Sequence, residues 1–153
     1  MVKRVALCAF LASGLAASSR ADLVAVADND NVYRIDNATA QTTLIGPSGS
    51  SLNASGLAPE WSTGRLFVSN VFLEGSIDAF GLSELNPATG AAVQVGGGDF
   101  GGAFIPGIAF ALDGTLLGAP LFGPGLVEID LVTSVATLRA PLTGASDTIG
   151  GLA

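Results

Sequence analysis

Leu82-Ser83-Glu84-Leu85-Asn86-Pro87-Ala88-Thr89-Gly90 is the stretch that decides the fold, because it has counterparts on both sides at nearly equal spacing. The earlier counterpart is Val32–Ala40 and the later one is Leu126–Ser134. Each copy has an apolar residue at its first and fourth positions and Asp or Asn at its fifth. Such internal repeats, with a period of about 20 to 50 residues, indicate a protein built from stacked copies of one structural unit.

A second motif recurs between these copies. It reads Gly56-Leu57-Ala58, then Gly107-Ile108-Ala109, then Gly151-Leu152-Ala153. Behind its first two copies come Gly64-Arg65-Leu66-Phe67 and Gly114-Thr115-Leu116-Leu117. Two independent motifs that recur together at nearly the same spacing indicate a true repeat of 44 to 50 residues.

Each repeat is predicted to form four short antiparallel strands. The Asp or Asn at positions 36, 86 and 130 can accept hydrogen bonds from backbone N–H groups two residues on, while Pro87 presets φ and Gly90 tolerates positive φ. This chemistry predicts a hairpin at residues 86–90. Adding the Gly-Leu-Ala strand and the strand at 66–68 gives the size and strand count of one β-propeller blade.

The sequence therefore predicts an all-β fold of propeller-like repeats, with about three blades that are either partial or completed by oligomerisation. The strand at Leu23–Val26 corresponds to the second strand of a repeat, and Gly151–Ala153 corresponds to a first strand. We expect one blade to combine residues 23–46 with the strand at Leu152. A β-sandwich is the alternative, because short strands with turn signals fit it as well.

The first 21 residues resemble a signal peptide. Lys3 and Arg4 precede the apolar run Val5–Ala17, and Ser19 and Ala21 place small residues before the expected cleavage site. The run is shorter than the about 20 apolar residues of a membrane-spanning helix. We expect residues 1–21 to be removed and residues 22–153 to form one secreted domain, extracellular or periplasmic, with no membrane attachment.

The expected mature chain is strongly acidic. Its three arginines stand against thirteen acidic residues, which gives a net charge of −10, and it has no Lys, His or Cys. Such a surface repels nucleic acid and anionic lipid. Without His, Cys or Lys there is no Ser-His-Asp triad, no common zinc site and no Schiff base. Carboxylates and oxygen-seeking metals remain.

The motif Leu-x-x-Ile-Asp-x-x-Thr-Gly with Gly-Leu-Ala resembles secreted bacterial β-propeller repeat proteins, the broad group near the NHL and YVTN repeats. The resemblance covers about Leu23–Ala153. Its motifs are structural, so it implies a fold and no activity. Because related chains usually have more blades, it leaves open that the repeat domain continues past Ala153.

Asp28 and Asp30 form the best candidate metal site. Calcium prefers six to eight oxygen ligands, and Asp28-Asn29-Asp30-Asn31 can present several from one tight turn. The favoured interpretation is a plain turn between Val26 and Val32. We expect no cofactor, with calcium as the alternative.

A candidate ligand site is predicted at Trp61, Phe72, Glu74 and Asp78. The second repeat is longer than the third near residues 72–78, and such insertions carry binding loops on a rigid scaffold. Aromatic rings beside carboxylates suit a protein or carbohydrate ligand. Packing between blades by Trp61, Phe72 and the nearby Phe67 and Phe80 is the favoured alternative.

Two further patterns are weak. Gly96–Gly101 satisfies G-x-G-x-x-G, but Pro106 and Gly107 follow too soon for the helix that a dinucleotide site needs. Glu84 and Glu128 share one repeat position, and glycosidases use paired carboxylates, but nothing brings these two together. We expect a non-catalytic binding or surface-scaffold module. The alternative is a carboxylate- or calcium-dependent polysaccharide hydrolase or lyase whose catalytic residues lie partly outside this chain.

Overall fold

The structure is a computed structural model that describes residues 5–9, 22–27, 29–49, 52–72, 79–97, 100–123, 125–143 and 152. These residues form strands joined by turns, with a single 3₁₀ turn, η1 (Phe100–Gly102). Among the described residues, no helix is long and apolar enough to cross a membrane.

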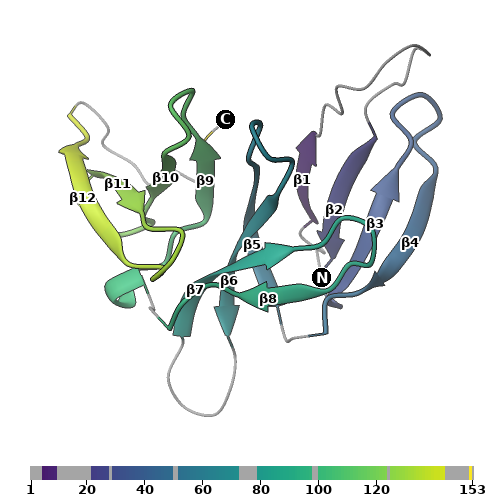
Figure 1. The fold of residues 1–153 in the computed structure, drawn as a ribbon, viewed down its shortest axis with the longest axis horizontal. Helices are drawn as coiled ribbons and strands as arrows, with labels where there is room; N and C mark the ends of the chain where they lie inside the picture. Colours follow the sequence, from purple (N-terminus) through teal and green to yellow (C-terminus); the bar gives the residue numbers. More distant parts are fainter. Residues whose placement is uncertain are drawn as a thin grey trace.

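The strands form three four-stranded antiparallel sheets (Figure 1). The first contains β1 (Val5–Ala9), β2 (Leu23–Ala27), β3 (Asn31–Ile35) and β4 (Thr42–Pro47); the second β5 (Leu52–Pro59), β6 (Leu66–Phe72), β7 (Ala79–Leu85) and β8 (Ala92–Gln94); and the third β9 (Gly107–Phe110), β10 (Leu116–Ala119), β11 (Gly125–Ile129) and β12 (Ala136–Pro141). Strands that follow each other in sequence are neighbours throughout. The predicted all-β fold of propeller-like blades is confirmed, and we call the sheets the first, second and third blade.

All three blades share one register. The residue that opens the second strand lies opposite the residue that closes the third, in the pairs Leu23 with Ile35, Leu66 with Leu85 and Leu116 with Ile129. The sequence repeat is therefore repeated residue by residue in the hydrogen-bonded ladders. A one-residue slip would turn every apolar side chain of a strand to the other face of its sheet.

The innermost strand of the first blade differs from the prediction. We expected the strand at Leu152 to pair with β2, but β1 takes that place, with Leu7 opposite Ala25. Leu152 belongs to none of the three sheets. The segment predicted as a signal peptide thus supplies a strand in this structure, because ladder pairing uses backbone groups that every strand has.

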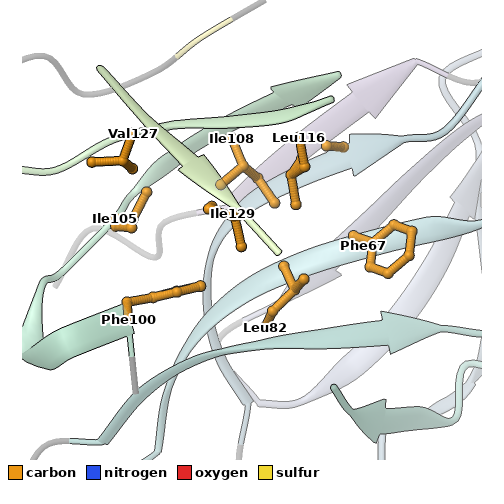
Figure 2. Packing of buried hydrophobic residues seen from close by; sticks show 9 residues of the cluster. Phe67, Leu82, Phe100, Ile105, Ile108, Leu116, Val127 and Ile129 are labelled. Atoms are coloured by element: carbon orange, nitrogen blue, oxygen red, sulfur yellow. The ribbon is translucent and has the colours of Figure 1, made fainter. Parts of the chain in front are cut away.

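Two apolar cores join the blades. Side chains alternate across β6, so Leu66 belongs to the core between the first and second blades and Phe67 to the core between the second and third. Figure 2 shows the second core, in which Phe67 and Leu82 of the second blade face Ile108, Leu116 and Ile129 of the third. Phe100 of η1 is also part of this core. The described residues of the Gly96–Gly101 segment thus lie in an inter-blade connection, as favoured from sequence.

The predicted hairpin chemistry is confirmed in all three blades. The Oδ1 atoms of Asp36, Asn86 and Asp130 each accept hydrogen bonds from the backbone N–H groups two and three residues on, at 2.7 to 3.3 Å. The fifth residue of each loop has positive φ: 56° at Ala40, 81° at Gly90 and 64° at Ser134. We call residues 36–41, 86–91 and 130–135 the rim loops.

The second and third rim loops each lie against the outer strand of the preceding blade. A Cβ added to Gly46 would overlap the carbonyl oxygen of Thr89, and one added to Gly96 would lie 2.5 Å from that of Thr133. The N–H of Leu82 also donates to Ser134 Oγ at 3.2 Å, and the N–H of Ala92 donates to the Ser48 carbonyl at 2.8 Å. Glycine is needed at 46 and 96 because backbone approaches backbone there.

Candidate functional site

A groove of about 350 Å³ lies between two turns of the second and third blades. The turn between β5 and β6 supplies Glu60, Trp61 and Ser62, and the turn between β9 and β10 supplies Ala111, Leu112, Asp113 and Gly114, with Phe110 beside them. Trp61 is 57% exposed and Leu112 fully exposed. An indole ring and an isobutyl group therefore form the rim of the groove and face solvent.

Backbone hydrogen bonds hold both turns. The N–H of Gly64 donates to the carbonyl of Glu60 at 2.8 Å, and positive φ at Gly64 completes that turn. In the opposite turn Gly114 N–H donates to the Ala111 carbonyl at 3.0 Å, with φ of 86° at Gly114. Because the backbone is fixed on both sides, Trp61 and Leu112 are exposed without being carried on long loops.

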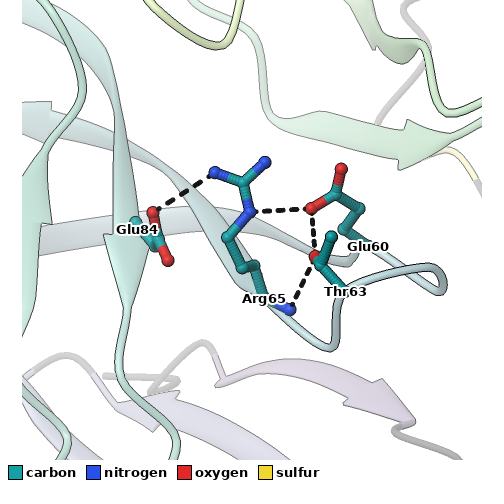
Figure 3. Close-up of polar contacts among 4 residues, drawn as sticks. All are labelled: Glu60, Thr63, Arg65 and Glu84. Carbon is teal, nitrogen blue, oxygen red and sulfur yellow. Dashed lines mark hydrogen bonds and ion pairs between the residues drawn. The ribbon is translucent and has the colours of Figure 1, made fainter.

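Glu60 is the most buried carboxylate described at the groove, at 8% exposure, and it is fully engaged (Figure 3). Arg65 Nε donates to Glu60 Oε2 at 2.8 Å, and the Thr63 hydroxyl donates to the same oxygen. The hydrogen bond from Arg65 lowers the pKa of Glu60 below its ordinary value, against the opposing effect of burial. Glu60 is therefore ionised near neutral pH.

Arg65 also reaches Glu84, whose carboxylate lies 3.7 Å from the guanidinium (Figure 3). The third blade repeats this arrangement around Arg139, which lies 4.0 Å from Asp113 and 3.7 Å from Glu128. Glu84 and Glu128 thus pair with different arginines in different blades. The structure does not bring them together as a catalytic pair.

Arg34 lies 3.7 Å from Asp22, so every arginine in the described part of the chain has a carboxylate partner. These pairs are largely solvent-exposed and contribute little to stability. They do neutralise the arginines, so the described surface offers anions no unpaired guanidinium.

A second hollow, of about 570 Å³, lies beside the rim loop of the second blade. It is lined by Arg65, Glu84, Asn86, Pro87 and Val93, among others, and Val93 is 69% exposed. Arg65 and Glu84 occupy one another there, which leaves the wall mainly apolar and backbone.

Trp61 and Phe72 do not lie together. Trp61 precedes β6 and Phe72 ends it, so the length of a seven-residue strand, about 20 Å, separates them. Glu74 and Asp78 lie outside the described residues. Of the predicted ligand set, Trp61 thus forms its groove with the third blade.

Phe67 and Phe80 serve inter-blade packing, the favoured alternative for those rings. Phe67 lies 5.6 Å from Phe110 and Phe80 lies 5.4 Å from Phe104, between ring centroids. Arg65 also stacks over Phe67, 5.0 Å from its centroid. Trp61, in contrast, remains more than half exposed.

At the predicted metal site, Asp30 lies in a turn. Its N–H donates to the Ala27 carbonyl at 2.9 Å, and its φ is 61°. Asp28 lies outside the described residues, and among those described no three metal-ligating side chains gather. The turn is confirmed at Asp30, and calcium binding stays a prediction.

Sequence reasoning missed Leu112 and Asp113 as partners of Trp61. The signal was present, since Gly64 and Gly114 align in the repeat and the residues before them form equivalent turns. It also missed two buried polar side chains, Ser69 and Asn70. Within the described chain, Ser69 Oγ and both amide atoms of Asn70 have no hydrogen-bond partner.

No family model matches the chain, and no curated protein matches it. Among solved structures, the chain is similar to the PQQ-bound form of aldose sugar dehydrogenase from Streptomyces coelicolor. The TM-score is 0.48 at 15% identity, and the match covers 82% of this chain and 48% of that one. The chain thus spans about half the length of that protein. At this level the similarity assigns neither an activity nor a ligand.

Proposed function

We propose that this chain is an exported, non-catalytic propeller-type module that binds a carbohydrate chain at Trp61, in the groove between the second and third blades. The observation that carries the proposal is the exposed indole of Trp61 on a hydrogen-bonded turn, facing Leu112 and flanked by the carboxylates of Glu60 and Asp113. An exposed aromatic ring offers an apolar face to a sugar, and polar groups beside it can accept from sugar hydroxyls.

The state of Glu60 favours binding over hydrolysis. A glycosidase needs one carboxylic acid with a raised pKa that protonates the leaving group. The pKa of Glu60 is lowered instead, because Arg65 and Thr63 donate to its carboxylate. Asp113 accepts from the Thr115 N–H at 3.0 Å, and its pKa is lowered as well. Both groups suit hydrogen-bond acceptors at the edge of a binding surface.

Export belongs to the same proposal. It is supported by the basic, apolar and small-residue segments of residues 1–21 and by the resemblance to secreted bacterial propeller repeats. Intact-mass measurement of material secreted from the full-length gene tests it. We expect a product that begins at Asp22, and a product that retains Lys3 and Arg4 would contradict export by this route.

Trp61 gives a direct optical test, because it is the only tryptophan in the sequence. Soluble β-glucan, xylan and chitin oligosaccharides would be titrated while its fluorescence is recorded. We expect the emission to shift to shorter wavelength with at least one of them, because a stacked sugar removes water from the indole.

Calorimetry on variants supplies the control. Trp61→Ala should weaken binding of the responding sugar by about tenfold or more, since aromatic anchors of this kind contribute at least about 1.4 kcal/mol. Trp61→Phe should retain much of it, and Phe122→Ala, an exposed ring outside the groove, should change nothing. Unchanged emission with all three sugars would refute carbohydrate binding at Trp61.

A further inference from the structure

The inner edge of the first blade is the feature considered, and the inference drawn from it rests on the proposed export. β2 pairs on that edge with β1, which lies wholly within residues 1–21. If those residues are removed, β2 loses its inner partner. Its residues Val24, Ala25 and Val26 are all buried in the folded chain. An apolar strand with an unpaired edge is a template for another strand.

The other two blades show which sequence belongs on that edge. Gly56-Leu57-Ala58 pairs with Ser69-Val68-Phe67, and Gly107-Ile108-Ala109 pairs with Ala119-Gly118-Leu117. In the shared register, the matching positions opposite Val26-Ala25-Val24 are held by Ala6-Leu7-Cys8. That triplet has the same order of small, large apolar and small residues as the Gly-Leu-Ala motif.

The third copy of the motif, Gly151-Leu152-Ala153, is the segment with this sequence that the blades do not use, since Leu152 lies in none of the sheets. We infer that in the exported protein Gly151-Leu152-Ala153 of a second copy of this chain replaces β1 and pairs with Val26-Ala25-Val24. The register places Leu152 of one copy opposite Ala25 of the other.

The connections within the chain indicate a second copy as the donor. The outer strand of each blade leads to the inner strand of the blade packed beside it, from β4 to β5 and from β8 to β9. The segment after β12 should likewise enter a blade on the open side of the third blade. The first blade of the same chain does not occupy that side, because β1 packs beside β5 and β5 beside β9 in an open arc (Figure 1).

Two copies that exchange this strand head-to-tail form six blades. Closed propellers have about four to eight blades, whereas three crowd the axis. The exchange is isologous as a pair, because each copy donates one strand and accepts one, and it leaves no open inner edge. Affinity would come from the backbone ladder and specificity from the small and apolar side chains of the motif.

Disulfide trapping tests the register. The only native cysteine is Cys8, so the cleaved protein has none, and the double variant Ala25→Cys with Leu152→Cys adds one matched pair. Because opposite residues alternate between two pair geometries, the neighbouring pair Val26→Cys with Gly151→Cys is made as well. Ala27→Cys with Leu152→Cys, displaced by two residues, is the matched control. Protein secreted from the full-length gene is oxidised and its mass is measured.

We expect a product that begins at Asp22 and forms a covalent dimer with at least one matched pair and not with the control. Light scattering should report a dimer for the unsubstituted protein, which covers the case in which a variant fails to fold. A cleaved product that is monomeric, or that forms its disulfide within one chain, overturns the second-copy exchange while export stands. A product that retains residues 1–21 overturns both, and its mass separates the two failures.

Discussion

Ser134 and Ser69 are both buried serines, and they differ in whether the hydroxyl has a partner. Ser134 Oγ accepts from the Leu82 N–H across the interface of the second and third blades. Ser69 Oγ has no partner within the described chain and lies beside Gly56, where a Cβ would come within 2.8 Å of it. The same change at both positions therefore separates a hydrogen bond from simple burial.

We expect Ser134→Ala to lower the free energy of unfolding by about 1 to 3 kcal/mol, because it leaves the Leu82 N–H unsatisfied in the core. Ser69→Ala should be neutral or slightly stabilising, since it removes an unsatisfied hydroxyl and adds no atoms. Urea denaturation of both variants measures the difference. Equal losses would mean that the Leu82 hydrogen bond contributes nothing.

Glu60 predicts how stability depends on pH. Hydrogen bonds from Arg65 and Thr63 lower its pKa in the folded state, so folding favours the ionised carboxylate. The resulting stabilisation is fully present above the ordinary pKa of 4.5 and is lost as pH falls through the lower folded pKa. Asp130, whose pKa the N–H groups of Thr133 and Val132 lower, acts in the same direction.

Urea midpoints measured from pH 7 down to pH 3 should therefore fall less steeply for Glu60→Gln than for the unsubstituted chain. Thr63→Val removes one of the two donors and should give an intermediate slope. Parallel curves for all three proteins would show that Glu60 titrates alike in the folded and unfolded states.

At the scale of elements, the three rim loops use one set of backbone bonds in different surroundings. The fifth residue has positive φ in each, yet Ala40 is exposed whereas Gly90 and Ser134 are buried against the preceding blade. A Cβ on Gly90 would lie 2.8 Å from the Gly46 carbonyl oxygen. Local conformation and blade docking can thus be separated by substitution.

Ala40→Gly should stabilise the chain by about 0.5 to 1 kcal/mol, because glycine removes the strain of a left-handed residue. Gly90→Ala should destabilise it by about 1 to 3 kcal/mol, because it adds both strain and overlap. Melting temperatures of the two variants provide the measurement. A loss of stability in Ala40→Gly would mean that chain entropy outweighs the relief of strain.

At the scale of the whole molecule, the arc presents an unlike surface at each end. The first rim loop lies free of any preceding blade, and the outer strand of the third blade has Ala140 where the first two blades have Gly46 and Gly96. In the proposed two-chain ring these ends meet. The methyl group of Ala140 would then hold the rim loop of the second copy further out than its counterparts within the chain.

Ala140→Gly should therefore tighten the dimer, by about fivefold if relieving the overlap contributes about 1 kcal/mol. Ala140→Val should weaken it. Sedimentation equilibrium of the cleaved protein measures both dissociation constants, and melting of dilute protein checks that the monomer is unchanged. Identical constants for the three proteins would show that Ala140 lies away from the contact between copies.

The local features followed from the sequence, because each depends on residues close together in the chain. The side chains of Asp36, Asn86 and Asp130 bond within their own loops, so the hairpins could be predicted from one residue and its next three neighbours. The four-stranded unit followed from the recurrence of these hairpins with the Gly-Leu-Ala motif. Together they predicted the blades and their number.

Other features depend on contacts between distant residues. Phe67 and Trp61 are aromatic neighbours in sequence, yet Phe67 is fully buried against the third blade and Trp61 lies on its own turn in solvent. The need for glycine at 46 and 96 came from rim loops more than thirty residues further along the chain. The inner partner of β2 was mispredicted because backbone pairing accepts any apolar strand of suitable shape, and only the packing of whole blades selects one.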